Sequence, residues 1–314
     1  MSFSRFSYAF SALILSAFLT FGCGRSNDSN VVSDPSDLTD ETTATFEQPA
    51  PAEPTSEEPT PPVVTAQPKF DAKGVSVDLS EIAGFAGTPS AELAQWQNVK
   101  VVRGKGLLTK GALETFAAIP QLTEFLWIEA ALEPDAADAF RAVMTKPTVK
   151  KIRLQGLRSA EDAAEFPSFA LKTLAESQSL VDLDISGSAI DAAKEFGLVD
   201  LARSFPALTK LNLYQTNVGD AGVEKLLPLA DRLTWLNLDD AGISPASAAN
   251  ITAFSNLTFL HVGRSTLDDA SVLELAKLTK LEKIHITRSG VTETGANALR
   301  EALPNCVVVS QPEN

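Results

Sequence analysis

The stretch Leu208-Thr-Lys-Leu211-Asn-Leu213 decides the fold, because the chain repeats it. Three further copies follow at steps of 25, 24 and 24 residues: Leu233-Thr-Trp-Leu236-Asn-Leu238, Leu257-Thr-Phe-Leu260-His-Val262 and Leu281-Glu-Lys-Ile284-His-Ile286. Apolar residues recur at positions 1, 4 and 6 of each line. In a strand, successive side chains point to opposite faces, so positions 4 and 6 face inward together. The pattern predicts a repeat protein whose units each add one short strand to a continuous core.

The same frame extends in both directions. Position 1 also falls on Leu180, Val149, Leu122, a weaker Trp96 and, downstream, Leu303. In the outermost strands, the inward residues expected from this frame are Val99, Val101, Cys306 and Val308. The steps vary from 22 to 31 residues, and we expect the extra residues in the segments between strands. The sequence predicts about eight repeats and a closing strand.

Each strand is expected to lead into a helix on the other side of the sheet. Position 12 carries a residue that can cap the free N–H groups of a helix start in four repeats: Asp191, Ser244, Asp268 and Thr292. Position 12 therefore marks the predicted start of a helix.

On these residues the chain resembles the leucine-rich-repeat family over residues 96–314, with units similar to those of the ribonuclease-inhibitor-like horseshoes. The resemblance implies an α/β solenoid with a parallel concave sheet and convex helices, and a binding scaffold without a cofactor. One departure is at position 9, where the family has Asn or Cys and this chain has residues such as Ala241, Ser265 and Ser289. Ser can still bond to the turning backbone, whereas Ala cannot. Residues 69–95, with alternating Val75, Val77 and Leu79, are expected to form an N-terminal cap.

The N-terminus predicts export. Residues 1–22 hold one basic residue and then the apolar stretch Phe6–Phe21, which is short for a spanning helix and typical of a signal peptide. The sequence Leu19-Thr-Phe-Gly-Cys23 resembles a bacterial lipobox, whose Cys becomes lipid-modified. The resemblance to bacterial leucine-rich-repeat lipoproteins then implies a membrane anchor at Cys23 in the cell envelope. By resemblance to the sorting of Gram-negative lipoproteins, the absence of Asp after Cys23, where Gly24 stands, would allow transport to the outer membrane. The alternative is ordinary cleavage after Gly22 and a secreted protein.

Residues 23–68 are predicted to be a disordered tether. They hold eight prolines among Ser, Thr and acidic residues, and nine acidic residues against one basic residue give them a net charge of −8. The residues from Lys69 onward carry 24 basic and 31 acidic residues, a net charge of −7. This balance does not suggest nucleic acid as a partner, because phosphate binding needs clustered positive charge.

Positions 3, 5 and 7 of the strands are expected to face outward on the concave side, as three columns across the sheet. In the first half of this face, the charges of neighbouring side chains in a column alternate in sign. We name these residues the charge ladder: Glu124, Lys151, Arg153, Asp182, Asp184 and Lys210. The second half forms an aromatic patch, predicted to bind a partner, which consists of Tyr214, Trp235, Asn237, Asp239, Phe259, His261 and His285. Large aromatic residues on a rigid exposed sheet are typical anchors of binding. In the alternative reading, a ring-on-ring contact or the C-terminal residues Gln311–Asn314 cover them.

His261 and His285 are neighbours in column 5, with Asp239 nearby. Three readings of this group are open: exposed polar contacts within the patch, a proton-sensitive pair, or a zinc site of two imidazoles and a carboxylate. The sequence shows no second shell for a metal, so no metal is predicted.

No sequence motif of catalysis is present. The chain lacks a Gly-rich phosphate loop, a nucleophile elbow and a His-x-x-x-His pair, which predicts a non-enzymatic protein. One functional hypothesis is a tethered scaffold that binds a protein partner. A second is a carbohydrate or small-ligand module, in which the aromatic residues stack on sugar rings. A third is structural packing within a larger surface assembly.

Overall fold

The computed structural model describes residues 67–310, which lie within the compact unit Pro62–Asn314. Its strands join in one sheet in the order β1-β2-β3-β4-β5-β7-β8-β9-β10-β11-β12, with β6 paired to β4. The strands are β1 (Lys69–Phe70), β2 (Ser76–Asp78), β3 (Val101–Leu108), β4 (Glu124–Leu132), β5 (Lys151–Leu154), β6 (Arg158–Ser159), β7 (Asp182–Asp184), β8 (Lys210–Asn212), β9 (Trp235–Asn237), β10 (Phe259–His261), β11 (Lys283–His285) and β12 (Val307–Val309). From β2 onward every pairing is parallel. The predicted leucine-rich-repeat solenoid is confirmed.

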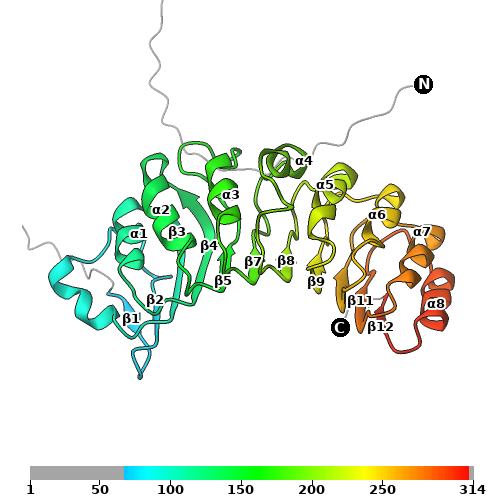
Figure 1. Ribbon diagram of the computed structural model, residues 1–314, viewed down its shortest axis with the longest axis horizontal. Coiled ribbons are helices and arrows are strands. Elements are labelled where there is room, and N and C mark those ends of the chain that lie inside the picture. The colour runs from blue at the N-terminus through cyan, green and yellow to red at the C-terminus, as the bar shows by residue number, and fades with distance from the viewer. Residues whose placement is uncertain (1–66, 311–314) are drawn as a thin grey trace, which may run out of the picture. The chain divides into compact units, whose positions relative to one another are not determined.

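The helices lie together on one side of the strands (Figure 1). They are α1 (Lys110–Ala117), α2 (Ala137–Met144), α3 (Ser168–Ala175), α4 (Ala192–Glu195), α5 (Gly219–Leu226), α6 (Ala248–Ile251), α7 (Asp269–Glu274) and α8 (Glu293–Ala302). Short 3-10 helices accompany them: η1 (Ser90–Trp96), η2 (Pro134–Ala136), η3 (Phe196–Leu198), η4 (Leu227–Leu229), η5 (Pro245–Ser247) and η6 (Leu275–Lys277). Because the helices of residues 67–310 cover one face only, the other face of the sheet is open as far as these residues are concerned.

The predicted caps at position 12 are confirmed. The side chains of Ser244, Asp268 and Thr292 accept hydrogen bonds from backbone N–H groups of η5, α7 and α8. Asp191 accepts one from the backbone N–H of Lys194 in α4 at 3.1 Å. Each cap satisfies an N–H group that has no partner within its helix, which starts the helix at this place.

The strand register follows the sequence frame from β4 to β11. Phe125, Ile152, Leu183, Leu211, Leu236, Leu260 and Ile284 pair in succession, and all seven are buried. This row is position 4 of the repeat. The register predicted for positions 3 and 5 of these strands is therefore confirmed.

The frame is wrong by three residues in the first repeat. Val102, and not Val99, pairs with Phe125, so position 6 of this repeat is Gly104. An odd shift exchanges the two faces of a strand, and Val101 accordingly faces outward while Val102 is buried. The reason is Trp127, whose ring fills the space next to Gly104: a Cβ there would lie 2.2 Å from it. A large neighbour has replaced the expected apolar side chain.

The closing strand is displaced by two residues, because Val308 pairs with Ile284 and takes position 4. An even shift preserves the inward face, and Cys306 is buried as expected.

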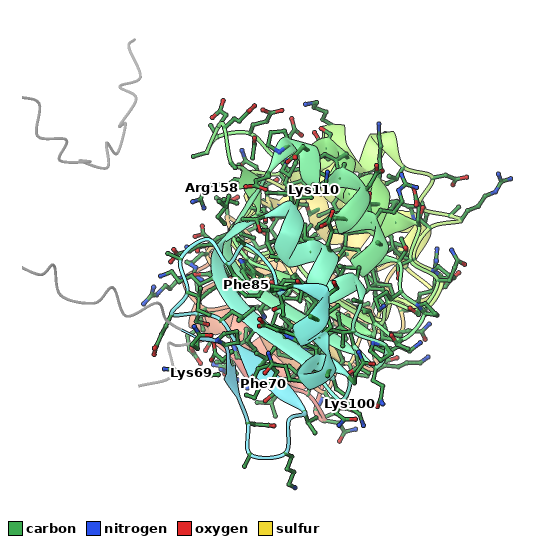
Figure 2. All side chains as sticks on the ribbon, turned by 90° about the vertical axis from the view of Figure 1, so that its left-hand side faces the viewer. Lys69, Phe70, Phe85, Lys100, Lys110 and Arg158 are labelled. Atoms are coloured by element: carbon green, nitrogen blue, oxygen red, sulfur yellow. The ribbon has the colours of Figure 1, made fainter. Side chains whose placement is uncertain are left out.

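The N-terminal end is covered by residues 69–96. The strand expected around Val75–Leu79 is present as β2, next to β3. Trp96, which the frame placed at the start of a strand, ends η1 and packs against Phe70, Phe85 and Phe116 with ring centroids 5.3 to 6.2 Å apart. Figure 2 looks onto this end, with Phe70 and Phe85 labelled. These rings close the first core layer, which has no preceding repeat to cover it.

Position 8 has a left-handed backbone in all eight repeats. Three of these residues are glycines and five are not: Gly106, Glu129, Gly156, Gly187, Gln215, Asp240, Arg264 and Arg288, with φ from 44° to 83°. The turn after each strand therefore bends sharply at this residue, a conformation that side chains other than Gly adopt at some cost. At position 9, the hydroxyls of Thr216, Ser265 and Ser289 donate to the carbonyl three residues earlier, which confirms the local bond predicted for Ser.

No helix within residues 67–310 is long and apolar enough to cross a membrane. The predicted signal peptide, Cys23, most of the tether and the Gln311–Asn314 cover lie outside the described residues.

Candidate functional site

The open face of the sheet carries the candidate site. Its side chains come from positions 3, 5 and 7 of the strands, and those of column 3 pair in the order Glu124, Lys151, Asp182, Lys210, Trp235, Phe259 and Lys283. Paired strands lie about 4.8 Å apart, so neighbours in a column are within reach of each other. The sheet thus holds these side chains in fixed order.

The charge ladder pairs across β5 and β7. Arg153 Nε donates to Asp184 Oδ2 at 2.9 Å, and Lys151 Nζ lies 3.9 Å from Asp182. Asp184 is buried, although it was predicted on the outward column. Burial raises the pKa of the half-buried Asp182, against the opposing charges of Lys151 and Lys210. The ladder satisfies part of its charge internally, as the sequence predicted.

Four rings form a continuous row on β9, β10 and β11, which we name the aromatic–histidine cluster: Trp235, Phe259, His285 and His261. The rings of Trp235 and Phe259 are stacked, with centroids 4.8 Å apart and planes 6° apart. Phe259 contacts His285 at 5.6 Å, and His285 contacts His261 at 4.7 Å. All four are half-buried, because each ring covers its neighbours. The ring-on-ring contact considered from the sequence is therefore present, and part of each ring remains exposed.

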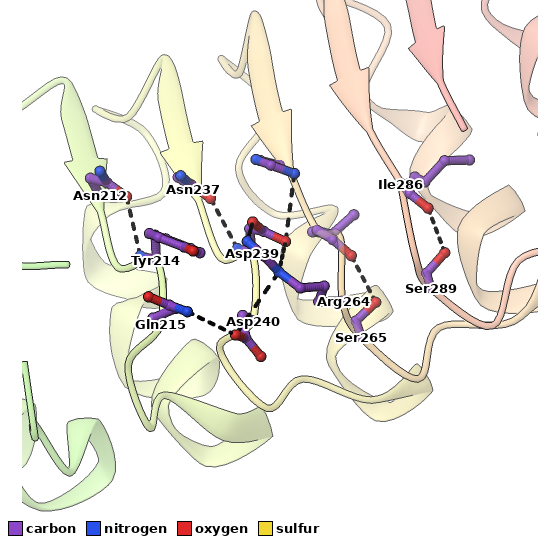
Figure 3. Close-up of polar contacts among 12 residues, drawn as sticks. Asn212, Tyr214, Gln215, Asn237, Asp239, Asp240, Arg264, Ser265, Ile286 and Ser289 are labelled. Atoms are coloured by element: carbon purple, nitrogen blue, oxygen red, sulfur yellow. Dashed lines mark hydrogen bonds and ion pairs between the residues drawn. The ribbon is translucent and has the colours of Figure 1, made fainter. Parts of the chain in front are cut away.

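Beside this cluster lies an ion pair between a buried carboxylate and a half-buried arginine, which was not predicted from the sequence. Arg264 Nε donates to Asp239 Oδ1 at 3.2 Å, and Arg264 Nη2 donates to Asp239 Oδ2. The guanidinium carbon of Arg264 lies 4.9 Å above the ring of Tyr214. Figure 3 shows Tyr214, Asp239 and Arg264 together at the strand ends. The arrangement combines a charge-assisted pair with a cation–π contact, and it fixes three side chains of the patch.

Arg264 escaped prediction because it stands at position 8, outside the alternating columns. Its left-handed backbone, with φ 44°, turns the side chain back toward the preceding repeat. The signal in the sequence is an acidic residue at position 7 followed, one repeat later, by a basic residue at position 8.

The position-5 side chains of three strands have a further role. Asp184, Asn212 and Asn237 each accept a hydrogen bond through the side-chain oxygen from the backbone N–H two residues later, at 2.9 to 3.1 Å. Two of these bonds are drawn in Figure 3. They hold the strand ends in the geometry of an Asx turn, in which a side-chain oxygen replaces a backbone acceptor. Because the oxygen of Asn212 is used in this way, its amide nitrogen is left to donate elsewhere.

The side chain of His261 is 20% exposed. Its Nε2 is buried without a hydrogen-bond partner among residues 67–310 and lies 3.6 Å from Asp239 Oδ1. Burial lowers the pKa of His261 to about 4, although Asp239 opposes this effect; the charges of His285, Arg264 and Lys283 lower it further. The imidazole is neutral at pH 7, so the sensitive range of a proton switch would lie in acid and not near neutrality.

Within residues 67–310, no group of three or more His, Cys, Asp or Glu side chains is arranged to hold a metal ion. The carboxylate considered as a third ligand, Asp239, instead pairs with Arg264. The cluster and its surroundings combine stacked rings, amides held by hydrogen bonds and paired charges.

No protein-family model matches the chain, and no curated protein matches it. The chain is similar to the crystal structure of internalin C2 from Listeria monocytogenes, with 16% identity, a TM-score of 0.47, and coverage of 70% of this chain and 83% of that chain. It is also similar to a leucine-rich-repeat protein of Leptospira interrogans, with 16% identity, a TM-score of 0.46, and coverage of 74% of this chain and 59% of that chain. The fold assignment rests on the repeats and strand pairing described above.

Proposed function

We propose that this leucine-rich-repeat protein is a non-enzymatic interaction scaffold that binds a protein partner through the open face of its sheet. The observation that carries the proposal is the aromatic–histidine cluster, in which Trp235 and Phe259 stack at 4.8 Å with part of each ring exposed. Aromatic side chains held in one orientation lose little conformational freedom on binding, which makes them favoured anchors.

The polar surroundings support the same reading. Asn237, Tyr214 and Asp239 are held by hydrogen bonds or by Arg264, so a partner meets a surface that is already ordered. An anchor surrounded by fixed polar groups is the usual anatomy of a protein interface.

We further propose that the protein is exported and anchored in the bacterial cell envelope through a lipid on Cys23, with residues 24–68 as tether. The lipobox-like sequence ending at Cys23 supports this proposal. Labelled palmitate should enter the wild-type protein and fail to enter Cys23→Ser. Wild-type protein that stays unlabelled and appears in the medium would establish ordinary cleavage after Gly22 instead.

Crosslinking capture from envelope extract tests the binding proposal. The full chain should capture a defined partner, and Trp235→Ala should lose it while the midpoint of thermal unfolding changes little. Ile128→Ala is the matched control, because Ile128 is an exposed apolar residue of β4 on the same face, distant from the cluster. A chain ending at Ser310 serves as a second control, because it lacks Gln311–Asn314, the residues considered as a cover for the aromatic patch. It should capture at least as much partner as the full chain.

Three results would overturn the proposal. Equal capture by Trp235→Ala and wild type would place the interface elsewhere. Equal loss of capture and stability would mean that Trp235 serves only to hold the fold. Self-association that Trp235→Ala does not change, with no other protein captured, would favour structural packing in an assembly.

A further inference from the structure

A hollow of about 220 Å³ opens on the sheet face between the charge ladder and the aromatic–histidine cluster. Four neighbouring strands of the sheet, β5, β7, β8 and β9, supply its lining: Arg153, Asp182, Asp184, Lys210, Asn212 and Trp235. All six residues stand at position 3 or 5. The hollow is therefore built on paired strands and not on loops, which favours a fixed shape.

Trp235 forms the wall of this hollow on the β9 side. Its ring and the ring of Phe259 are nearly parallel at a centroid distance of 4.8 Å, too close for rings lying edge to edge in one plane. The two rings must therefore face each other along the column. Phe259 covers one face of the indole, and the opposite face points toward β8, where Lys210 and Asn212 line the hollow. An apolar stacking surface is thus available.

The formal charges around the hollow cancel. Arg153 and Lys210 stand against Asp182 and Asp184, and Arg153 already pairs with Asp184 at 2.9 Å. An incoming cation would be attracted by the two carboxylates and repelled by Arg153 and Lys210, and an incoming anion would meet the reverse. Because attraction and repulsion offset each other, neither ion regains the solvation that it loses on a partly buried surface. A neutral ligand avoids this cost.

The same lining offers hydrogen bonds of both kinds. The Asn212 amide nitrogen can donate, since its oxygen is held by the Tyr214 N–H at 3.1 Å. Lys210 is exposed and can donate through Nζ. Asp182 can accept, because its contact with Lys151 is 3.9 Å, longer than a hydrogen bond. A ligand rich in hydroxyl groups, each both donor and acceptor, matches this set.

We propose that the hollow binds one neutral sugar ring of a glycan, with the apolar face of the ring against Trp235 and its hydroxyls on Asp182, Lys210 and Asn212. The volume of about 220 Å³ equals roughly seven waters at ~30 Å³ each, room for a single ring with its hydroxyls. This site goes beyond the proposed protein interface. It uses the face of Trp235 that Phe259 leaves uncovered and does not depend on any protein partner.

Calorimetric titration of the full chain tests the site. The probes are neutral oligomers of glucose, galactose, mannose and N-acetylglucosamine, with a polyuronate oligomer, a chitosan oligomer and hexa-arginine as charged comparators. At least one neutral oligomer should bind, with a dissociation constant below about 1 mM. Trp235→Ala, Asp182→Ala and Asn212→Ala should each weaken it by about tenfold or more. Ile128→Ala should bind as wild type does, and melting curves should show all four variants folded.

The subsite is overturned if only a charged comparator binds, if nothing binds up to about 10 mM, or if the Asp182 and Asn212 variants bind as wild type does. Protein capture by the same variants separates the two proposals. Capture that survives Asp182→Ala while sugar binding is lost supports two separate sites. Capture by a wild-type chain that binds no sugar leaves the protein interface standing and removes the subsite.

Discussion

Arg264 reaches from one repeat to the carboxylate of Asp239 in the preceding repeat and holds both of its oxygens. Asp239 is only 4% exposed, on a face that is otherwise open. A carboxylate withdrawn from water in this way is tolerated because a guanidinium satisfies it with two parallel bonds. The same guanidinium lies over Tyr214, so the pair also orders an aromatic residue of the candidate site.

Arg264→Ala should lower the free energy of unfolding by about 3 kcal/mol, because it leaves the Asp239 charge buried without its partner. Denaturation in urea measures this value. Arg288→Ala is the matched control, since Arg288 occupies the same left-handed position one repeat later and is exposed. It should change stability by no more than about 0.5 kcal/mol. Equal small effects of both substitutions would contradict the role given to Arg264.

Gly263 should tolerate no larger side chain. A Cβ at this residue would lie 2.8 Å from Asp239 Oδ1, 2.8 Å from the Thr287 carbonyl oxygen and 3.0 Å from His261 Nε2. Gly263→Ala should therefore lower the free energy of unfolding by about 1 to 3 kcal/mol, through displacement of closely packed atoms. Gly197→Ala is the control, because nothing lies within 4 Å of a Cβ there. If both variants unfold at the same urea concentration as wild type, the crowding around Gly263 is not real.

His261 should make the protein less stable in mild acid. Its pKa is about 4 in the folded protein, below the ordinary value of 6.5. The unfolded chain therefore binds a proton more readily than the folded one. The stabilisation is complete above pH 6.5 and is lost as the pH falls through 4; the part lost between pH 7 and pH 5 is on the order of 2 kcal/mol.

Urea denaturation at pH 7 and pH 5 measures this loss. His261→Gln removes the titrating group, so the difference between wild type and variant should change over this range, while carboxylates shared by both chains cancel. His285→Gln is a comparison on the neighbouring ring. A constant difference between wild type and His261→Gln at both pH values would disprove the assignment.

Much of the open face could be predicted from the sequence because strand alternation is a strict rule. Once Leu211, Leu236 and Leu260 are aligned, the residues directly before and after each of them in its strand must point to the opposite face of the sheet. The rule failed where a packing choice replaced the pattern. Gly104 has no apolar side chain to mark the inward position, and only the structure shows that the Trp127 ring of the next repeat occupies its space.

The depth of each side chain could not be predicted, because it depends on turns beyond the strands. Alternation placed Asp239 outward, and the turn residue Arg264 then covers it. The hollow beside Trp235 likewise follows from the direction of one indole ring, which the sequence does not specify. Gly156 and Gly187, the two glycines at position 8 of the sequence frame, were the available sign that this turn requires a left-handed residue.

Arg232 should be the strongest single link between two repeats away from the open face. Its two terminal nitrogens, with four N–H groups, lie within hydrogen-bond distance, 2.8 to 3.4 Å, of five carbonyl oxygens, those of Leu201, Ala202, Ser204, Phe205 and Pro228. These bonds hold the end of the preceding loop, where Phe205 is buried with φ 52°.

Arg232→Ala should cost about 3 kcal/mol of unfolding free energy, since several carbonyls lose a charged donor. Arg232→Lys should recover less than half, because an ammonium cannot reach carbonyls on both sides as a planar guanidinium does. Arg203→Ala, whose side chain is 89% exposed, should cost at most about 1 kcal/mol. Full stability of Arg232→Lys in urea denaturation would show that charge alone, and not the shape of the guanidinium, joins the two repeats.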